Sequence, residues 1–369
     1  MATEPATRVL HIAAGNLYGG VEVVLATLAR HRNLCARSRH AFALCYEGRL
    51  ARELDSIGAA PLLLGPARVR KPWSVLRARA KLSRALRDFD LAVCHSAWAH
   101  ALFASVIRRA SLGLVTFLHN ETSGQHWLER WSRATLPDLV VCNSEFTRRG
   151  AELAFPGIRS LVWYPAVPAR GATQGQQERL RQELGVSDEA VLIAQVGRFE
   201  RLKGHERHLN ALARLRPAPP WHCVQVGEPQ AEGERVYLQK LRRRAERLGI
   251  DQRVSFVGFR SDVSEILGAA DIYCQPNIGA EAFGLSLAEA LGAGLPIVTS
   301  RLGAAPELLG DSGIFADDER ELAEALQALV DSPSRRRERA EAARARWSAL
   351  CDPERQIPAL DAVLAAAGA

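Results

Sequence analysis

The sequence predicts an α/β protein built from two Rossmann-like, parallel-sheet domains. Short apolar runs alternate with amphipathic segments, and the alternation pauses in a stretch rich in Pro, Gly and Gln before it starts again. Strands that alternate with helices form a parallel sheet with helices on both faces. The chain of 369 residues is long for one core and suits two domains of ordinary size.

The first half is expected to open with a strand, a glycine loop and a helix, in the order RVLHIAA, GNLYGG and VEVVLATLARH. The basic stretch RKPWSVLRARAKLSRALRDF predicts a further helix. The other strands expected in this half are HAFALCYE, APLLLG, LAVCHS, GLVTFLH and DLVVCNS.

The second half repeats the same alternation. Its expected strands are AVLIAQVGR, HCVQVGE, RVSFVG, ADIYCQP, LPIVTS and SGIFA. Its expected helices are GHERHLNALARL, YLQKLRRRAERLG, DVSEILGAA and an almost wholly apolar helix within EAFGLSLAEALGAGLPIV, from Glu281 to Val298.

These elements predict an N-terminal domain over 1–166, a linker over 167–184 and a C-terminal domain over 185–350. The linker is placed in the Pro, Gly and Gln-rich stretch, because domain boundaries fall in such segments. We expect a C-terminal helix over 351–369 to pack back on the N-terminal domain. Two Rossmann-like sheets would turn the carboxyl ends of their strands toward one interdomain cleft.

The net charge of +7 is unevenly distributed between the two halves. Residues 1–170 contain 23 Lys and Arg against 12 Asp and Glu, a balance of +11, whereas the remainder contains 25 against 29, a balance of −4. This asymmetry predicts an anionic partner for the first half, either a membrane surface or an acidic acceptor. Nucleic acid is not expected, because no recognition motif accompanies the charge.

Composition and the N-terminus predict a cytoplasmic protein. Hydrophobic residues make up 47% and charged residues 24%, without an apolar run near the length of a membrane span. The opening MATEPATRVLHIAAG lacks the basic segment and apolar core of a secretion signal. Seven cysteines without CxxC spacing predict reduced thiols rather than a disulfide framework or zinc site.

Two cations flank a predicted helix start in VGRFERLKGHE. Arg198 follows a strand and Lys203 precedes a helix, with Gly197 and Gly204 beside them. Charge-assisted bonds to phosphate oxygens are strong, and a helix N-terminus favours an anion. The segment therefore predicts a diphosphate site, with an ordinary solvated turn as the alternative.

A carboxylate, Glu289, lies in the middle of the apolar helix. A buried charge without a partner is costly, so Glu289 needs a partner unless it reaches sideways to solvent. Ahead of the helix, Gly284 permits close backbone approach, and the free first-turn amides could hold an anion. Helical side chains lean toward the N-terminus, so Glu289 should point at whatever those amides bind.

Together, GRFERLKG and EAFGLSLAE, in which Glu281 and Glu289 bracket seven residues, resemble the retaining GT-B glycosyltransferases of family 4, the glycosyl transferases group 1. The resemblance covers nearly the full length. GGVE at Gly19 to Glu22 is similar to the family's N-terminal glycine loop, FLHN to the strand with its acceptor-side histidine, and APEL at 305–308 to its PE turn. It implies the GT-B fold, in which two Rossmann-like domains face one cleft.

The resemblance implies that Arg198 and Lys203 hold the diphosphate of a nucleotide sugar, that Glu289 bonds the ribose, and that Glu281 contacts the donor sugar. It also implies that His119 meets the transferred sugar. The catalytic residues that it implies are His119, Glu281, Arg198 and Lys203. The donor-binding residues that it implies are Gly20, Gly197, Arg198, Lys203, Glu281, Phe283, Gly284, Leu285, Ser286 and Glu289.

Other positions carry weaker indications. We expect His95, Trp98 and Asn120, which follow strands, to line the acceptor pocket. Asn143 and Ser144 are expected to be a helix N-cap. The chain departs from the family pattern at Ala282 in place of glycine, at Arg207 and His208 in place of apolar residues, and in VGEPQ, which lacks a second glycine.

The resemblance implies a metal-independent, retaining hexosyltransferase that uses a UDP- or GDP-hexose and no cofactor. Its acceptor would be a sugar, a lipid-linked glycan or another hydroxyl compound in bacterial glycan, glycolipid or glycoconjugate synthesis. One alternative is a disaccharide phosphorylase or sucrose-synthase-like enzyme on the same fold. Others are a nicotinamide dehydrogenase, although GNLYGG departs from GxGxxG, and a non-catalytic sugar-nucleotide-binding protein.

The segment 68–87 is basic and carries no acidic residue, with Trp73, Val75, Leu76, Leu82 and Leu86 interleaved among its cations. A basic helix with an apolar stripe is typical of segments that lie on anionic membranes. This pattern predicts peripheral contact with the inner face of the cell membrane. The alternative is an ordinary surface helix whose apolar side packs on the sheet.

Overall fold

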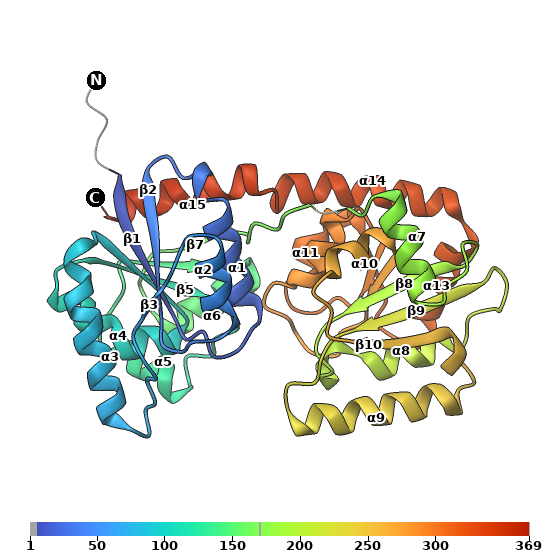
Figure 1. Ribbon diagram of the computed structural model, residues 1–369, viewed down its shortest axis with the longest axis horizontal. Helices are drawn as coiled ribbons and strands as arrows, with labels where there is room; N and C mark the ends of the chain where they lie inside the picture. The colour runs from blue at the N-terminus through green and yellow to red at the C-terminus, as the bar shows by residue number, and fades with distance from the viewer. Residues whose placement is uncertain (1–5, 170, 369) are drawn as a thin grey trace. The chain divides into compact units, whose positions relative to one another are not determined.

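The computed structural model describes residues 6–169 and 171–368 (Figure 1). Its contacts divide the chain into two compact units. Unit 1 comprises Met1–Ala166 and Pro353–Ala369, and unit 2 comprises Val167–Asp352. Each unit is a parallel sheet with helices on its faces, so the predicted α/β class with two parallel-sheet domains is confirmed.

Unit 1 contains a seven-stranded sheet in the order β3-β2-β1-β4-β5-β6-β7. Every pairing in it is parallel, as the βαβ pattern requires. The order runs outward in both directions from the β1 and β4 pair. The strands are β1 Thr7–Ala13, β2 Ser38–Leu44, β3 Leu62–Leu63, β4 Leu91–His95, β5 Gly113–Leu118, β6 Leu139–Cys142 and β7 Ser160–Val162.

Alternate residues of the unit 1 strands pack against different helices. Leu10 and Ile12 of β1 lie in a core cluster with Leu82 and Leu102, whereas Val9 lies in a separate cluster with residues of the first and last helices. The helices are α1 Gly20–Arg30, α2 Arg49–Ser56, α3 Pro72–Ala85, α4 Ala97–Arg109, α5 Trp127–Ser132, α6 Glu145–Ala154 and α15 Pro353–Gly368.

The C-terminal helix α15 belongs to unit 1, although 186 residues of unit 2 separate it from the rest of that unit. Its residues Ile357, Leu360 and Leu364 are buried in the cluster that also holds Val9 and Phe117. The helix therefore covers the face of the sheet toward which the odd-numbered residues of β1 point.

Unit 2 contains a six-stranded parallel sheet in the order β10-β9-β8-β11-β12-β13. Its core joins Ile193 and Cys223 of the sheet to Leu241 and Leu326 of the helices. The strands are β8 Val191–Val196, β9 Trp221–Val226, β10 Val254–Gly258, β11 Ile272–Gln275, β12 Ile297–Thr299 and β13 Gly313–Phe315. The helices are α7 Gln174–Glu183, α8 His205–Leu212, α9 Glu232–Arg247, α10 Val263–Ala269, α11 Leu285–Gly292, α12 Ala305–Leu309, α13 Glu319–Asp331 and α14 Pro333–Leu350.

The segment expected as a linker contains helix α7. A capping box between Thr173 and Gln176 begins the helix, and Gln177 Nε2 donates to the carbonyl oxygen of Gly268 at 2.7 Å. The segment thus packs on α10 within unit 2. Its polar sequence gives little helical periodicity, because Leu180 is its one buried residue among those that the structure describes.

The apolar helix expected between Glu281 and Val298 is shorter than its sequence suggests. Gly284 has a φ of 89°, a left-handed conformation that fixes the helix start, and α11 ends at Gly292. The residues before Gly284 form a loop, and Ile297 already belongs to β12. Among the described residues, no helix has both the length and the apolar character needed to cross a membrane.

Candidate functional site

The carboxyl ends of β8 and β11 form the switch point of the unit 2 sheet, because the strand order runs outward from this pair in both directions. Ligands of open α/β sheets bind at such points. The loop after β8 carries Arg198 and ends in the short 3-10 helix Arg201–Lys203. The loop after β11 carries Asn277 and Glu281. The two predicted motifs therefore meet at one edge of one sheet.

Lys203 and Glu281 form an ion pair at the centre of this edge. Lys203 Nζ lies 2.5 Å from Glu281 Oε1, and both side chains are mostly buried, with 14% and 20% exposure. The other oxygen, Glu281 Oε2, accepts from Gln275 Nε2 and from Asn277 Nδ2, each at 3.0 Å. The carboxylate is thus fixed by three donors, two of which come from residues that the sequence motifs did not identify.

Arg198 is held by two carboxylates. Its Nη1 lies 2.7 Å from Glu200 Oε1, and its Nη2 pairs with Glu234 in the first turn of α9. The side chain is 40% exposed, but its Nε is buried without a hydrogen-bond partner in the described part of the chain. A guanidinium with an unsatisfied donor can accept a further anionic partner.

Two glycines let the backbone segments of this edge approach each other closely. A Cβ on Gly204, whose φ is 70°, would lie 1.8 Å from the carbonyl oxygen of Pro276. A Cβ on Gly227 would lie 1.9 Å from the carbonyl oxygen of Gly197. Gly227 is the single glycine of VGEPQ, so the contact that this loop requires is present without the second glycine.

The first turn of α11 places the remaining predicted donor-binding residues beside this edge. Phe283 is buried, and Ser286 Oγ donates to Gln275 Oε1 at 2.9 Å. Leu285 and Glu289 are half-buried. Glu289 is therefore neither fully enclosed nor freely solvated on this helix.

Two residues that depart from the family pattern, His208 and Arg207, have polar partners close to the same loop. His208 is fully buried and its Nδ1 lies 2.7 Å from Gln195 Oε1, while burial lowers the pKa of His208 to about 3. Gln195 Nε2 in turn donates to the carbonyl oxygen of Lys203 at 2.9 Å. Arg207 donates to Ser300 Oγ at 3.1 Å. Polar partners thus replace the usual apolar contacts and support the loop that carries Lys203.

In unit 1, His119 lies directly after β5 and is 7% exposed. Asn143 Nδ2 donates to its carbonyl oxygen at 3.0 Å, so Asn143 supports His119 rather than capping a helix. Ser144 is the N-cap of α6, where its Oγ accepts from Thr147 N, as predicted. Asn120 is exposed.

Trp98 and Gly20 have mainly structural surroundings. Trp98 is half-buried against the core of unit 1, with its ring edge-on to Phe103 at 6.3 Å between centroids. Gly20 is the first residue of α1, and the Gly19 amide before it donates to Glu22 Oε2 at 3.0 Å. Burial raises the pKa of Glu22.

His95 ends β4 and is followed by a strained residue. Ser96 has φ 123° and ψ 160°, a region that is populated almost only by glycine, and it is the N-cap of α4. Backbone strain of this kind is concentrated at functional sites. It occurs beside β1 and β4, the switch point of the unit 1 sheet.

His95 and His119 belong to a row of four histidines that crosses one face of the unit 1 sheet. His119 Nε2 lies 2.9 Å from His95 Nδ1, and His95 Nε2 lies 2.8 Å from His11 Nδ1. The row continues from His11 Nε2 to His40 Nδ1 at 2.8 Å. Sequence analysis missed His11 and His40. The sequence could have revealed them, because each lies on a strand adjacent in the sheet and on the same face of the sheet as His95.

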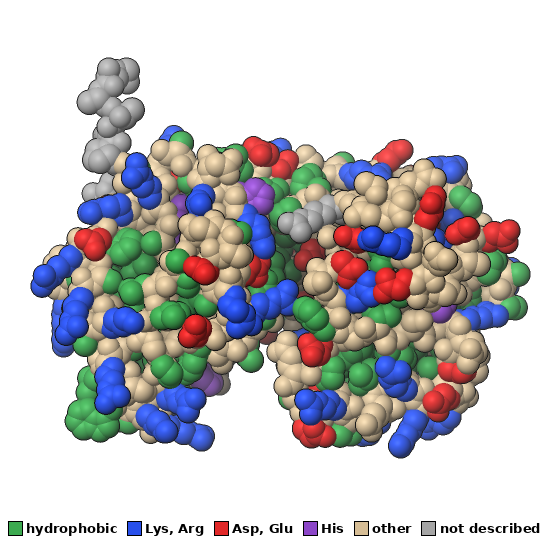
Figure 2. Space-filling model, viewed as in Figure 1, with side chains coloured by type: hydrophobic (Ala, Val, Ile, Leu, Met, Phe, Trp, Pro, Cys, Tyr) green, Lys and Arg blue, Asp and Glu red, His purple; other side chains and the backbone are tan. Residues whose placement is uncertain are grey.

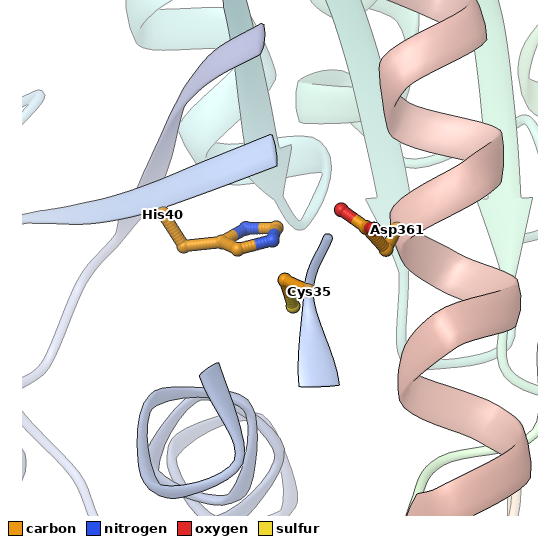
Figure 3. Close-up of side chains that lie close together, drawn as sticks. All are labelled: Cys35, His40 and Asp361. Carbon is orange, nitrogen blue, oxygen red and sulfur yellow. The ribbon is translucent and has the colours of Figure 1, made fainter. Parts of the chain in front are cut away.

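Beyond His40, the row ends near Cys35 and Asp361, as Figure 3 shows. Potential ligand atoms of Cys35, His40 and Asp361 all lie within 4.8 Å of one another, the one such group among the described residues. Both Asp361 oxygens already accept hydrogen bonds, from Arg37 N at 2.8 Å and from Ser38 Oγ. These bonds hold the carboxylate in place beside His40.

Two family descriptions match the chain, one for each half. "Glycosyl transferases group 1" matches residues 176–346, and "Glycosyltransferase Family 4" matches residues 18–169. The first match includes Arg198, Lys203, Glu281 and Glu289, and the second includes His95 and His119.

Curated relatives are similar over part of their length. D-inositol 3-phosphate glycosyltransferase of Corynebacterium kroppenstedtii is 39% identical over 170 residues, which are 43% of this chain and 37% of that protein. Lipopolysaccharide glucosyltransferase WaaG of Escherichia coli is 32% identical over 189 residues, 49% of this chain and 47% of that protein. The chain thus matches less than half the length of these relatives.

Solved structures are similar over almost the whole chain. Anabaena HepE in complex with UDP and glucose superposes with a TM-score of 0.84 at 24% identity, covering 97% of this chain and 98% of that one. WaaG superposes with a TM-score of 0.71 at 20% identity, covering 96% and 99%. At these identities the likeness concerns the fold.

Proposed function

Because this chain belongs to the GT4-type GT-B glycosyltransferases, we propose that it transfers a hexose from a nucleoside diphosphate sugar to an acceptor hydroxyl with retention. The proposal includes a UDP- or GDP-hexose donor, and neither a metal nor another cofactor. HepE, which shares the fold, has been solved with UDP and glucose. The corresponding ligand in this chain would be the donor.

One observation carries the proposal: at the switch point of unit 2, the loop that carries Arg198 and Lys203 meets Glu281, and Gln275 links Glu281 to Ser286 in the first turn of α11. Two cations and a helix N-terminus suit a diphosphate, and the carboxylate suits sugar hydroxyls. The Arg198 side chain is 40% exposed, so an arriving phosphate can reach its guanidinium. Two cations at one site indicate an anionic ligand rather than a neutral one.

In the proposed reaction the bond between the anomeric carbon and the diphosphate oxygen breaks first. Arg198 and Lys203 stabilise the negative charge that develops on the leaving diphosphate, which is where electrostatic catalysis is most effective. The acceptor oxygen then bonds to the anomeric carbon on the same face of the ring. Its proton passes to the departing phosphate oxygen, so charges and protons balance without a metal.

We propose a hydroxyl of an anionic or lipid-linked compound as the acceptor, in bacterial glycan, glycolipid or glycoconjugate synthesis. The relatives are named for D-inositol 3-phosphate and lipopolysaccharide, and both names are consistent with such an acceptor. The charge balance of +11 over residues 1–170 favours an anionic partner for the N-terminal half.

Helix α3 supports a further part of the proposal, peripheral contact with an anionic membrane. Its residues Val75 and Leu82 are buried, so part of the apolar stripe packs on the core. Trp73 and Leu76 nevertheless remain 75% and 50% exposed. Figure 2 shows hydrophobic and basic side chains together over α3, at the lower left. Exposed aromatic and basic groups favour binding to anionic lipid surfaces.

The donor can be identified by melting the protein with a panel of nucleoside diphosphate sugars. A ligand that binds only the native state stabilises it by about 2.7 kcal/mol at a hundredfold excess over Kd. We expect UDP- or GDP-hexoses to raise the melting temperature, with release of the nucleoside diphosphate in an acceptor assay. Stabilisation without any transfer would favour a non-catalytic binding protein, and turnover with free phosphate would favour a phosphorylase.

A further inference from the structure

The row of histidines in unit 1 extends from His119 to the C-terminal helix. After the three imidazole contacts, His40 Nε2 lies 2.9 Å from Ser38 Oγ, which donates to Asp361 Oδ1. Asp361 lies on α15, which covers this face of the sheet. One continuous hydrogen-bonded chain therefore joins a residue near the end of the sequence to the predicted catalytic histidine.

Each imidazole of the chain is neutral at pH 7. Burial lowers the pKa of His40 to about 4 and that of His119 to about 3, and it lowers the pKa of His11 and His95 well below the ordinary value. A neutral imidazole has one N–H donor and one acceptor nitrogen. Each ring can therefore donate on one side only and must accept on the other.

Asp361, at one end of this series of hydrogen bonds, determines which nitrogen of each imidazole donates. A carboxylate only accepts, so Ser38 must give its single proton to Asp361 and must accept from His40 Nε2. His40 Nδ1 is then an acceptor and receives the proton of His11 Nε2. The same reasoning passes through His95 to His119, whose Nε2 carries the proton.

We propose that Asp361 is a positioning residue that fixes the tautomer of His119. With its proton on Nε2, His119 keeps Nδ1 as a bare acceptor, and no hydrogen bond joins Nδ1 to another described residue. Nδ1 is therefore the nitrogen available to a hydroxyl of the sugar or of the acceptor. The part of this inference that concerns sugar hydroxyls rests on the proposed function, whereas the tautomer does not.

The substitution Asp361→Asn tests the inference, because asparagine has nearly the same shape as aspartate but should reverse the donor and acceptor of each hydrogen bond in the series. Arg37 N is an obligatory donor to position 361, so it takes the amide oxygen and leaves the amide NH2 facing Ser38. Ser38 must then donate to His40, and donor and acceptor are exchanged in each hydrogen bond between His40 and His119. Two-bond 1H–15N spectra of histidine-labelled protein distinguish the two nitrogens of each ring.

We expect all four rings of the wild type to be protonated on Nε2, and all four rings of Asp361→Asn to be protonated on Nδ1. Asp138→Asn is the matched control: this carboxylate also accepts from a backbone amide, that of Leu114 at 2.8 Å, but it lies outside the chain. His100 is an internal control, since its Nε2 faces the carbonyl oxygen of Thr135 and must remain protonated in every variant.

Either of two spectra overturns the proposal. One is a wild type in which any ring of the chain carries its proton on Nδ1, a result that does not depend on the folding of a variant. The other is a folded Asp361→Asn protein whose tautomers are unchanged.

A transfer assay then tests the consequence for the reaction. We expect Asp361→Asn to lower kcat about tenfold, the effect of about 1.4 kcal/mol from one misdirected hydrogen bond, with nucleoside diphosphate affinity unchanged. Reversed tautomers with unchanged kcat overturn the role of Asp361 in transfer. If the wild type transfers no sugar at all, the proposed function fails while the tautomer result stands.

Discussion

At the scale of single residues, the ion pair of Lys203 with Glu281 and the double pairing of Arg198 dominate the unit 2 site. Both cations are held by carboxylates in the structure. A diphosphate must therefore compete with Glu281 for Lys203 and with Glu200 and Glu234 for Arg198. This exchange of partners keeps the cations in place, so that little side-chain ordering is required on binding.

Lys203→Ala and Arg198→Ala are expected to weaken nucleoside diphosphate binding roughly 10- to 100-fold each, because a charge-assisted bond contributes about 1.5–3 kcal/mol. Isothermal titration calorimetry with UDP and GDP measures the effect. Arg243→Ala is the control, because Arg243 is an exposed cation further along α9. Equal affinities in all four proteins would refute the diphosphate assignment.

Glu289→Gln and Glu281→Gln are expected to have different effects. The first should lower nucleoside diphosphate affinity, because a carboxylate accepts more strongly from ribose hydroxyls than an amide does. The second should chiefly lower kcat, since Glu281 is assigned to the sugar, and it frees Lys203 from its ion pair. Calorimetry beside a transfer assay separates the two. If Glu281→Gln instead lowered the affinity and Glu289→Gln lowered kcat, Glu281 would be the ribose ligand and Glu289 the sugar contact.

The sequence identified the residues of this site that lie in short, local motifs. Arg198, Lys203 and Glu281 each follow a strand within a few residues, and Gly284 marks a helix start. Sequence alone did not reveal Glu234, because it approaches Arg198 from the start of α9. Asp361 was equally hidden, since 323 residues separate it from Ser38.

At the scale of elements, α3 is a surface helix that exposes apolar side chains beside its cations. Its exposed cations include Arg77, Lys81 and Arg84, beside the exposed Trp73 and Leu76. Arg79 is different, because its Nε donates to the carbonyl oxygen of Leu102 at 2.6 Å and burial lowers its pKa. Arg79 therefore contributes to packing rather than to a free basic surface.

We expect the protein to float with anionic liposomes at low salt and to be released as salt is added, because each basic residue near the surface contributes about 1 kcal/mol. Reversing Arg77, Lys81 and Arg84 to Glu should abolish flotation. Reversal of Arg242, Arg243 and Arg247 on α9, which are also exposed, is the matched control. A wild type that ignores anionic vesicles would exclude the membrane proposal.

Two of the missed elements, β7 and α7, lack a strong period, whereas the helices α2, α6 and α13 are amphipathic and were nevertheless not named. The expected strands overlap twelve observed strands because their apolar runs are short and bounded by turn residues. Strand β7 was not predicted, since its three residues, SLV, precede a stretch interrupted by proline. Helix α7 was assigned to the linker because its sequence is polar and its helical character depends on packing against α10.

At the scale of the whole molecule, buried histidines couple stability to pH in both units. Burial lowers the pKa of His40 and His100 to about 4 and that of His119 and His208 to about 3. The unfolded chain binds more protons than the native one between these values and the ordinary pKa of about 6.5. The contribution of these residues is therefore full above pH 6.5 and is lost as the pH falls.

The free energy of unfolding is thus expected to decrease from pH 6.5 toward pH 4, by about 1.4 kcal/mol per pH unit for each proton that the unfolded chain takes up in excess. Urea denaturation at intervals between pH 7.5 and pH 4.5 measures the slope. Carboxylates whose pKa is lowered by an arginine partner, such as Asp90 and Asp262, lose their contribution only from about pH 5 downward, so the slope between pH 6.5 and pH 5 reports the histidines. A constant free energy over this range would contradict the burial of neutral histidines.

Transfer of a hexose with retention is the proposed activity, and the anomeric configuration of the product distinguishes it from inversion. Proton NMR can follow the reaction of an α-linked nucleoside diphosphate hexose and record the anomeric signal of the new glycoside, which does not mutarotate. We expect an α-configured product to appear together with the free nucleoside diphosphate, and Lys203→Ala to slow both signals equally. A β-configured first product, or equal rates in Lys203→Ala and the wild type, would contradict it.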